Sequence, residues 1–124
     1  MKYLASVYSY GAKTDSDVDT LTRDERASYV MSRLKDMIVS GGTVYSPIAH
    51  WHQMSKEHGL PNEYAFFQRV DRAFIDKSDG VVVLKMPHWE KSEGITDEIN
   101  YAESLGLPVE YLDCPDYIDR FIED

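Results

Sequence analysis

Cysteine is almost absent from this chain of 124 residues, which has Cys114 alone. An intrachain disulfide is therefore excluded, and a reducing cytoplasmic compartment is the simpler expectation. No stretch approaches the roughly 18 apolar residues of a membrane-spanning helix. The apolar run at the start is also too short for a signal peptide. These absences predict a cytoplasmic protein with no membrane segment.

Basic side chains are also scarce, with 13 Lys and Arg against 22 Asp and Glu, for a formal net charge of -9. Such a chain repels nucleic acid polymers overall, while small phosphorylated ligands remain compatible with it. Internal repeats and linker-like tracts are lacking too. Residues 1–124 therefore suit one domain with one core.

Strand and helix signals alternate along the chain. Apolar, β-prone runs predict strands at residues 2–7, 43–46, 80–84 and 109–112. Helices are predicted from a capping box at Thr22-x-x-Glu25 to Gly41-Gly42, over 62–77, and from Ser92 to Gly106, with shorter ones within 48–61 and 117–122. Residues 11–19 are read as a polar loop. This order predicts a three-layer α/β/α fold of the flavodoxin or Rossmann-like type, with a parallel sheet of four or five strands, a central first strand and right-handed crossovers.

Ligands of such sheets bind beyond the carboxyl ends of the strands. The most informative stretch, VVVLKMPHWEKSEGITDEINYA over 81–102, runs from a buried strand through a polar loop into a helix. Together the first three strands deliver to this edge Ser6, Tyr8, Gly11, Ser46, His50, Trp89, Ser92, Gly94 and Glu98. Ser92, Gly94 and the free N–H groups of the helix suit a phosphate. The alternative is purely structural: Ser92 and Asp97 cap the helix, and Glu98 complements its dipole.

Asp71 lies at the border of the apolar face of the predicted helix 62–77. Most aspartates in helices are simply solvated, but Asp is a mediocre helix former, so this position favours a site role modestly. His50 and His52 are spaced as a possible metal pair, but Pro47 disfavours a strand there and no cysteine accompanies them. A ligand contact by His50 is the better hypothesis, and no metal or other cofactor is expected.

Aromatic residues near the loops, namely Tyr8, Tyr10, Trp51 and Trp89, either stack on a ligand or serve packing. A nicotinamide-dependent oxidoreductase is disfavoured, because no G-x-G-x-x-G follows the first strand.

Three segments carry a family resemblance: YLAS from Tyr3, leading to a Gly-containing loop; Asp71, eight residues before Asp79 and the strand GVVVL; and SEGITDEI around Glu98. In this order they resemble the nucleoside 2-deoxyribosyltransferase superfamily, and in particular its branch of 2'-deoxynucleoside 5'-phosphate N-hydrolases. The segments SPIAH and WEKSEGI resemble still more closely a small uncharacterised bacterial and phage family near that superfamily. The resemblance spans essentially the whole chain.

The resemblance implies roles for four residues. Glu98 matches the nucleophile that attacks C1' of the sugar, and Tyr3 a tyrosine that orients it. Asp71 matches a carboxylate that contacts the sugar or assists proton transfer, and Ser92 a contact to the 5'-phosphate. The first-strand loop departs from the hydrolase branch, because it lacks the arginine and paired glycines expected around a phosphate. The resemblance also implies a homodimer or higher homo-oligomer.

Two functions follow as hypotheses. The first is cleavage or transfer of the N-glycosidic bond of a nucleoside or nucleoside 5'-monophosphate through a covalent sugar intermediate on Glu98. The departing base needs an acid, either Asp71 or Asp97. The second is a catalytically silent nucleotide-binding module on the same fold.

Overall fold

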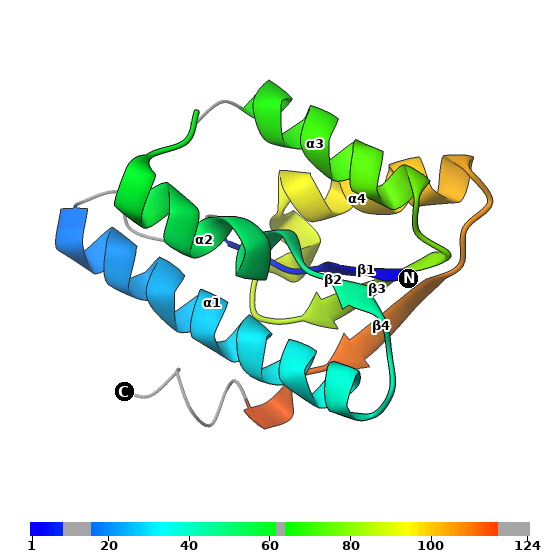
Figure 1. Ribbon diagram of the computed structural model, residues 1–124, viewed down its shortest axis with the longest axis horizontal. Coiled ribbons are helices and arrows are strands. Elements are labelled where there is room, and N and C mark those ends of the chain that lie inside the picture. Colours follow the sequence, from blue (N-terminus) through cyan, green and yellow to red (C-terminus); the bar gives the residue numbers. More distant parts are fainter. Residues whose placement is uncertain (9–15, 62–63, 117–124) are drawn as a thin grey trace.

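The computed structural model of the protein describes residues 1–8, 16–61 and 64–116 (Figure 1). The elements in chain order are β1 (Lys2–Ala5), α1 (Ser16–Val39), β2 (Val44–Tyr45), α2 (Pro47–His58), α3 (Tyr64–Asp76), β3 (Gly80–Lys85), a short 3-10 helix η1 (Trp89–Lys91), α4 (Glu93–Ser104) and β4 (Val109–Asp113). The predicted alternation of strands and helices is confirmed, including the helical piece before the third strand.

The described strands form one parallel sheet in the order β2-β1-β3-β4. Tyr3 of β1 lies opposite Tyr45 of β2 on one side and Val81 of β3 on the other. The first strand is therefore central, as predicted, and the loops after β1, β2 and β3 leave neighbouring strand ends. Strands β2 and β3 lie on opposite sides of β1, and the chain crosses over from one to the other. Segments that are distant in sequence therefore meet at the carboxyl edge of the sheet.

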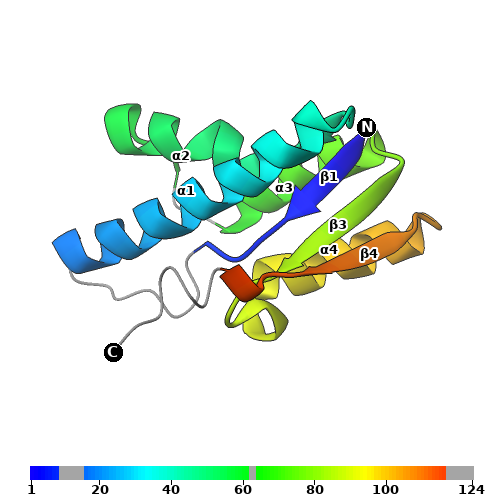
Figure 2. The same ribbon diagram turned by 90° about the horizontal axis from the view of Figure 1, so that it is seen from below.

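The helices cover both faces of the sheet, which confirms the three-layer α/β/α prediction (Figures 1 and 2). In Figure 1, α1 lies on one side of the strands, and α3 and α4 lie on the other. Helix α2 packs beside α1 near the carboxyl ends of the strands. Four consecutive residues of β3, Val81 to Leu84, are buried, as expected of a strand covered on both faces.

The start of the first helix differs from the prediction. Helix α1 begins at Ser16 and not at the Thr22-x-x-Glu25 capping box, so residues 16–19 are helical and do not belong to a loop. The Thr22-x-x-Glu25 pattern lies inside a longer helix. The sequence did not indicate the first turns of this helix, because they are polar and show no apolar stripe. Helix α1 ends at Val39, just before Gly41-Gly42, as predicted.

Several predicted features lie outside the described residues. The loop containing Tyr10 and Gly11 is one, and the closing helix over 117–122 is another. Among the helices of the described part of the chain, none combines the length and the apolar character needed to cross a bilayer.

Candidate active site

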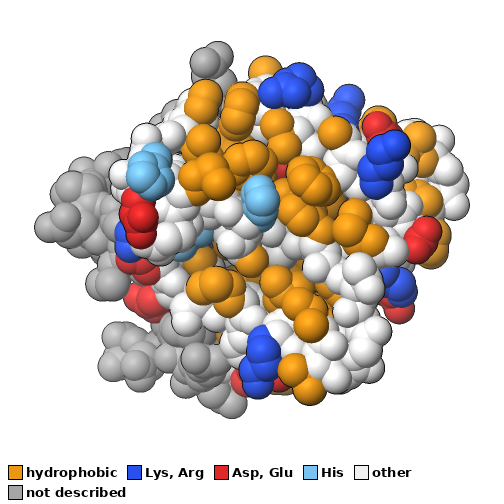
Figure 3. Space-filling view, viewed as in Figure 1, with side chains coloured by type: hydrophobic (Ala, Val, Ile, Leu, Met, Phe, Trp, Pro, Cys, Tyr) orange, Lys and Arg blue, Asp and Glu red, His pale blue; other side chains and the backbone are white. Residues whose placement is uncertain are grey.

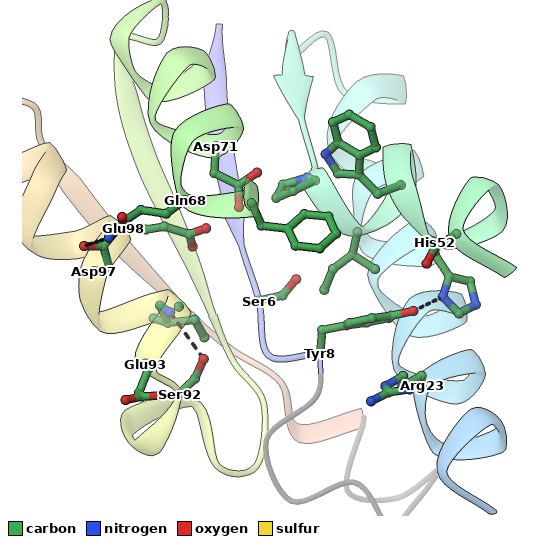
Figure 4. Close-up of a pocket in the computed structure, with 17 residues that line it drawn as sticks. Ser6, Tyr8, Arg23, His52, Gln68, Asp71, Ser92, Glu93, Asp97 and Glu98 are labelled. Atoms are coloured by element: carbon green, nitrogen blue, oxygen red, sulfur yellow. Dashed lines mark hydrogen bonds between the residues drawn. The ribbon is translucent and has the colours of Figure 1, made fainter. Parts of the chain in front are cut away.

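A cavity of about 540 Å³ opens at the carboxyl edge of the sheet, within the usual size range of small-molecule sites (Figure 4). Its walls come from the segment after β1, from α1, α2 and α3, and from the first turns of α4. The lining residues are Ser6, Tyr8, Arg23, Pro47, Ile48, Trp51, His52, Ser55, Phe67, Gln68, Asp71, Ser92, Glu93, Gly94, Ile95, Asp97 and Glu98. Five of the predicted site residues that the structure describes, Ser6, Tyr8, Asp71, Ser92 and Gly94, therefore share one cavity with Glu98.

Two carboxyl groups, from Asp71 of α3 and Glu98 of α4, point into the same part of the cavity (Figure 4). Glu98 is 8% exposed although it is a charged residue type. The hydroxyl of Tyr3, a fully buried residue in the central strand, donates a hydrogen bond of 2.6 Å to Oε2 of Glu98. The structure thus brings together Tyr3, Asp71 and Glu98 from three separate elements.

The pKa values of these two carboxyl groups are raised from their ordinary values. Burial, followed by repulsion from Asp71, raises the pKa of Glu98 well above its ordinary value. Burial likewise raises the pKa of Asp71 to about 6, although its interactions with Glu98 and Tyr3 oppose the shift. Burial and the nearby Glu98 raise the pKa of the Tyr3 hydroxyl, which therefore stays protonated as a donor. The pair accordingly retains a proton at pH values where separate carboxyl groups would be ionised, a pattern common at catalytic sites.

Glu98 and its neighbours share one face of α4. Gly94, Asp97 and Glu98 stand at i, i+3 and i+4, so all three reach the cavity. Ser92 is the N-cap of this helix, and its Oγ accepts a hydrogen bond of 3.2 Å from the backbone N–H of Ile95. The structural alternative for Ser92 is therefore correct as far as the cap is concerned. Ser92 also lines the cavity, so capping does not remove this residue from the site.

The carboxylate of Asp97 accepts hydrogen bonds from two side chains of α3. Its Oδ1 accepts hydrogen bonds from Arg72 at 2.6 Å and from Gln68 at 3.1 Å, and its Oδ2 lies 3.3 Å from Nε of Arg72. Both carboxylate oxygens are therefore bound to donors. This arrangement ties α4 to α3 and makes Asp97 a poor candidate for the acid that protonates a leaving group.

Helix α2 lines the cavity with a face that was not predicted. It begins directly after Ser46, whose Oγ accepts a hydrogen bond of 3.1 Å from the backbone N–H of Ala49, and Pro47 occupies its first position. The lining residues Ile48, Trp51, His52 and Ser55 follow at i, i+3, i+4 and i+7. That helical spacing was visible in the sequence and, read after the Ser-Pro start, would have identified His52 and Ser55.

Three predicted contacts do not line the cavity. Ser46 is a buried helix cap. His50 is exposed and packs its ring against Tyr45 and Trp51. It does not share a helix face with His52, so the two do not form a metal pair. Trp89 packs against Tyr111, with ring centroids 5.6 Å apart, and Gly11 lies outside the described residues.

Other lining residues were missed by the sequence reasoning. Arg23 comes from α1, and Phe67 and Gln68 come from α3. Arg23 lies in the helix whose start was predicted too late, and no local pattern marked it. Within the described residues, no three His, Cys, Asp or Glu side chains are grouped closely enough to hold a metal ion.

Comparison with family models gives a match to a domain of unknown function, DUF1937, over residues 1–113. The chain belongs to the DUF1937 family. The matched residues include every described strand and helix, and all the residues that line the cavity. Among curated proteins, no match to the chain is found.

Proposed function

We propose that this DUF1937 protein cleaves or transfers the N-glycosidic bond of a nucleoside or nucleoside 5'-monophosphate, with Glu98 as the nucleophile. The observation that carries the proposal is the pair of carboxyl groups formed by half-buried Asp71 and buried Glu98, with the Tyr3 hydroxyl 2.6 Å from Glu98. The sequence resemblance to the nucleoside 2-deoxyribosyltransferase superfamily supports it, because these three residues match that superfamily's catalytic positions.

The chemistry suits a buried carboxylate. Breaking the bond between C1' and the base builds positive charge on the sugar, which a carboxylate stabilises and then captures as an ester. Tyr3 binds Oε2 of Glu98, so Oε1 is the oxygen that attacks. The positive charge at C1' favours the ionised form of Glu98 just when the nucleophile is needed. Water then releases the sugar in a hydrolase, and a second base releases it in a transferase.

Two polar atoms in the cavity are suited to the sugar. Ser6 Oγ and Asp71 Oδ1 are both buried and have no hydrogen-bond partner among the residues that the structure describes. Buried polar atoms are normally paired, so both are suited to bind ligand hydroxyl groups. Asp71, close to Glu98, accepts a hydrogen bond from a sugar hydroxyl in this proposal. Trp51 and Phe67, whose rings lie edge to face with centroids 6.3 Å apart, supply an apolar wall for the base.

The test is a panel of nucleosides and nucleoside 5'-monophosphates, in which release of free base is followed by chromatography. Glu98→Gln keeps the shape of the side chain and removes the nucleophile, so base release is expected to fall by a factor of about 10³ or more. Glu93→Gln is the matched control, because Glu93 is an exposed carboxylate lining the same cavity. Base release that survives Glu98→Gln contradicts the nucleophile assignment. Ligand binding with no turnover in the wild type favours the silent nucleotide-binding module.

A homodimer in the cytoplasm belongs to the same proposal. Hydrophobic side chains gather on the face where α2 and α3 lie (Figure 3). Among the exposed large apolar residues, Met54 of α2 is 39% exposed. Patches of this kind are typical of protein interfaces. Sedimentation velocity of the intact chain tests the oligomeric state, and a monomer at all concentrations contradicts the dimer.

A further inference from the structure

A chain of hydrogen bonds runs from the cavity wall into the layer between α1 and α2. The Tyr8 hydroxyl lies 2.5 Å from Nδ1 of His52, a bond that Figure 4 shows. Nε2 of His52 lies 2.6 Å from Oδ1 of Asp24, and Nζ of Lys56 lies 3.0 Å from Oδ2 of Asp24. Tyr8 and His52 line the cavity, and in Figure 4 they lie on the other side of Ser6 from Asp71 and Glu98.

The ionised state of Asp24 fixes where the protons lie in this series of hydrogen bonds. Partial burial opposes ionisation of Asp24, but the hydrogen bonds from Lys56 and His52 outweigh it and hold the pKa below its ordinary value. Asp24 is therefore a carboxylate and only accepts hydrogen bonds. Nε2 of His52 must then carry a proton, and Nδ1 of the neutral ring accepts the hydrogen bond from Tyr8. A buried histidine held between a carboxylate and a hydroxyl is the arrangement that serves proton transfer in hydrolytic triads.

The proposed reaction requires a group that donates a proton to the leaving base. The inference about this group rests on the proposed function. Glu98 must act as an anion, Asp71 accepts from the sugar, and both oxygens of Asp97 are bound to α3. The leaving base still needs a proton. We infer that Tyr8, coupled through His52 to Asp24, is the group that protonates the departing base. Tyr8 is the catalytic residue in this assignment, and His52 and Asp24 are positioning residues.

The step balances in protons and electrons. Before the reaction Glu98 loses its proton to solvent and His52 takes up a proton from solvent at Nδ1, so that the imidazolium lies between the Asp24 carboxylate and the Tyr8 oxygen. As Glu98 bonds to C1', the C1'–N bond breaks and its electron pair stays on the base nitrogen. The Tyr8 proton passes to the base, and the Nδ1 proton passes to Tyr8. When water later replaces Glu98 on C1', its proton returns through Tyr8 to His52.

The charges that face His52 come from two helices. Asp24 of α1 contacts Nε2 of His52 directly, and Arg23 of α1 and Lys56 of α2 line a small pocket together with His52. Lys56 is itself paired with Asp24.

The test compares two leaving groups on the same sugar. One substrate is the nucleoside or nucleotide that the wild type cleaves, and the other is the 4-nitrophenyl glycoside of that sugar, whose nitrophenolate leaves without a proton. Tyr8→Phe and His52→Gln are expected to lower base release by about 100-fold or more, and nitrophenolate release by only about threefold. Asp24→Asn is expected to act in the same direction. The control is His50→Gln, in the same helix but outside the cavity.

Each outcome is decisive. Equal losses on both substrates, or full activity of Tyr8→Phe on the natural base, overturn the proton-donor assignment and leave Glu98 as nucleophile intact. A wild type that cleaves neither substrate overturns the proposed function and the relay together. A measurement on the unmodified protein guards against variants that fail to fold: ¹⁵N NMR of the histidine rings is expected to show the Nε2–H tautomer for His52. The Nδ1–H tautomer contradicts the relay.

Discussion

The Tyr3 hydroxyl donates a hydrogen bond of 2.6 Å to Oε2 of Glu98, across 95 positions of sequence. Tyr3 lies in the central strand and is fully buried, so its ring is held by the core and not by the ligand. The donor is thus fixed before any substrate enters, which is the condition for electrostatic preorganisation.

Tyr3→Phe is expected to lower base release about 10- to 100-fold. Tyr3 stabilises the ionised form of Glu98, so its loss raises the pKa of Glu98 further and moves the rise of activity to higher pH. The pH profile of kcat/KM checks this, with Tyr101→Phe as control because Tyr101 bonds to Asp76 away from the cavity. A reduced rate with an unchanged pH profile contradicts the assigned role.

Stability is expected to fall as the pH rises from about 4 through the raised pKa values of Asp71 and Glu98. In this range the folded protein keeps protons that the unfolded chain has lost, so deprotonation favours unfolding. The pKa of Asp71 moves from 3.8 to about 6. Asp71→Asn and Glu98→Gln remove the titrating group, so each variant is expected to be more stable than the wild type at pH 8, by on the order of 1–3 kcal/mol. Urea unfolding at pH 5 and pH 8 measures this, and a wild type that gains stability between the two contradicts it.

Asp97→Asn is expected to leave base release within about threefold of the wild type, because Asp97 is bound to Arg72 and Gln68 and does not act as the acid. Loss of the ion pair lowers the free energy of unfolding by about 1 kcal/mol. Arg72→Gln is the matched variant and is expected to cost a similar amount. A loss of activity by 100-fold or more in Asp97→Asn, with the fold intact, makes Asp97 the acid instead.

Two substitutions of Ser92 distinguish a capping role from a phosphate-binding role. Ser92→Ala removes the cap of α4 and is expected to lower the free energy of unfolding by about 1 kcal/mol, whereas Ser92→Asp keeps a capping oxygen. If Ser92 contacts a 5'-phosphate, both variants raise KM for the nucleoside 5'-monophosphate, Ser92→Ala about tenfold and Ser92→Asp by more, and leave KM for the nucleoside unchanged. The added negative charge makes Ser92→Asp the more severe variant. Equal KM changes for the two substrates assign Ser92 to the cap alone.

Regular patterns made most of the fold predictable. The run of apolar residues in β3 and the turn signals around it placed that strand correctly. Helix α4 was also anticipated, because Ser92 caps it and Gly106 follows it. Prediction was wrong at the start of α1, where polar turns hid six residues of helix before Thr22. Local propensity is weak there and does not resolve a helix boundary.

The candidate site was partly predictable for a different reason. Glu98 and Asp71 stand out locally, the first beside a helix start and the second at the edge of an apolar face. His52 was read only as a possible metal partner of His50, although the helix turns the two side chains apart. The contact between His52 and Asp24 joins residues 28 positions apart, and no local pattern signals it.

The sequence alone determined the α/β class, the parallel sheet and the edge at which a cavity is expected, because hydrophobic periodicity and capping are local properties of the chain. The tertiary structure alone decided which side chains meet at that edge. It buried Glu98 beside Asp71 and beneath Tyr3, and so raised the pKa of both carboxyl groups. It also joined Tyr8 to His52 and Asp24. Burial and through-space contact depend on how helices pack across the sheet, and that packing is not written in any short stretch of the sequence.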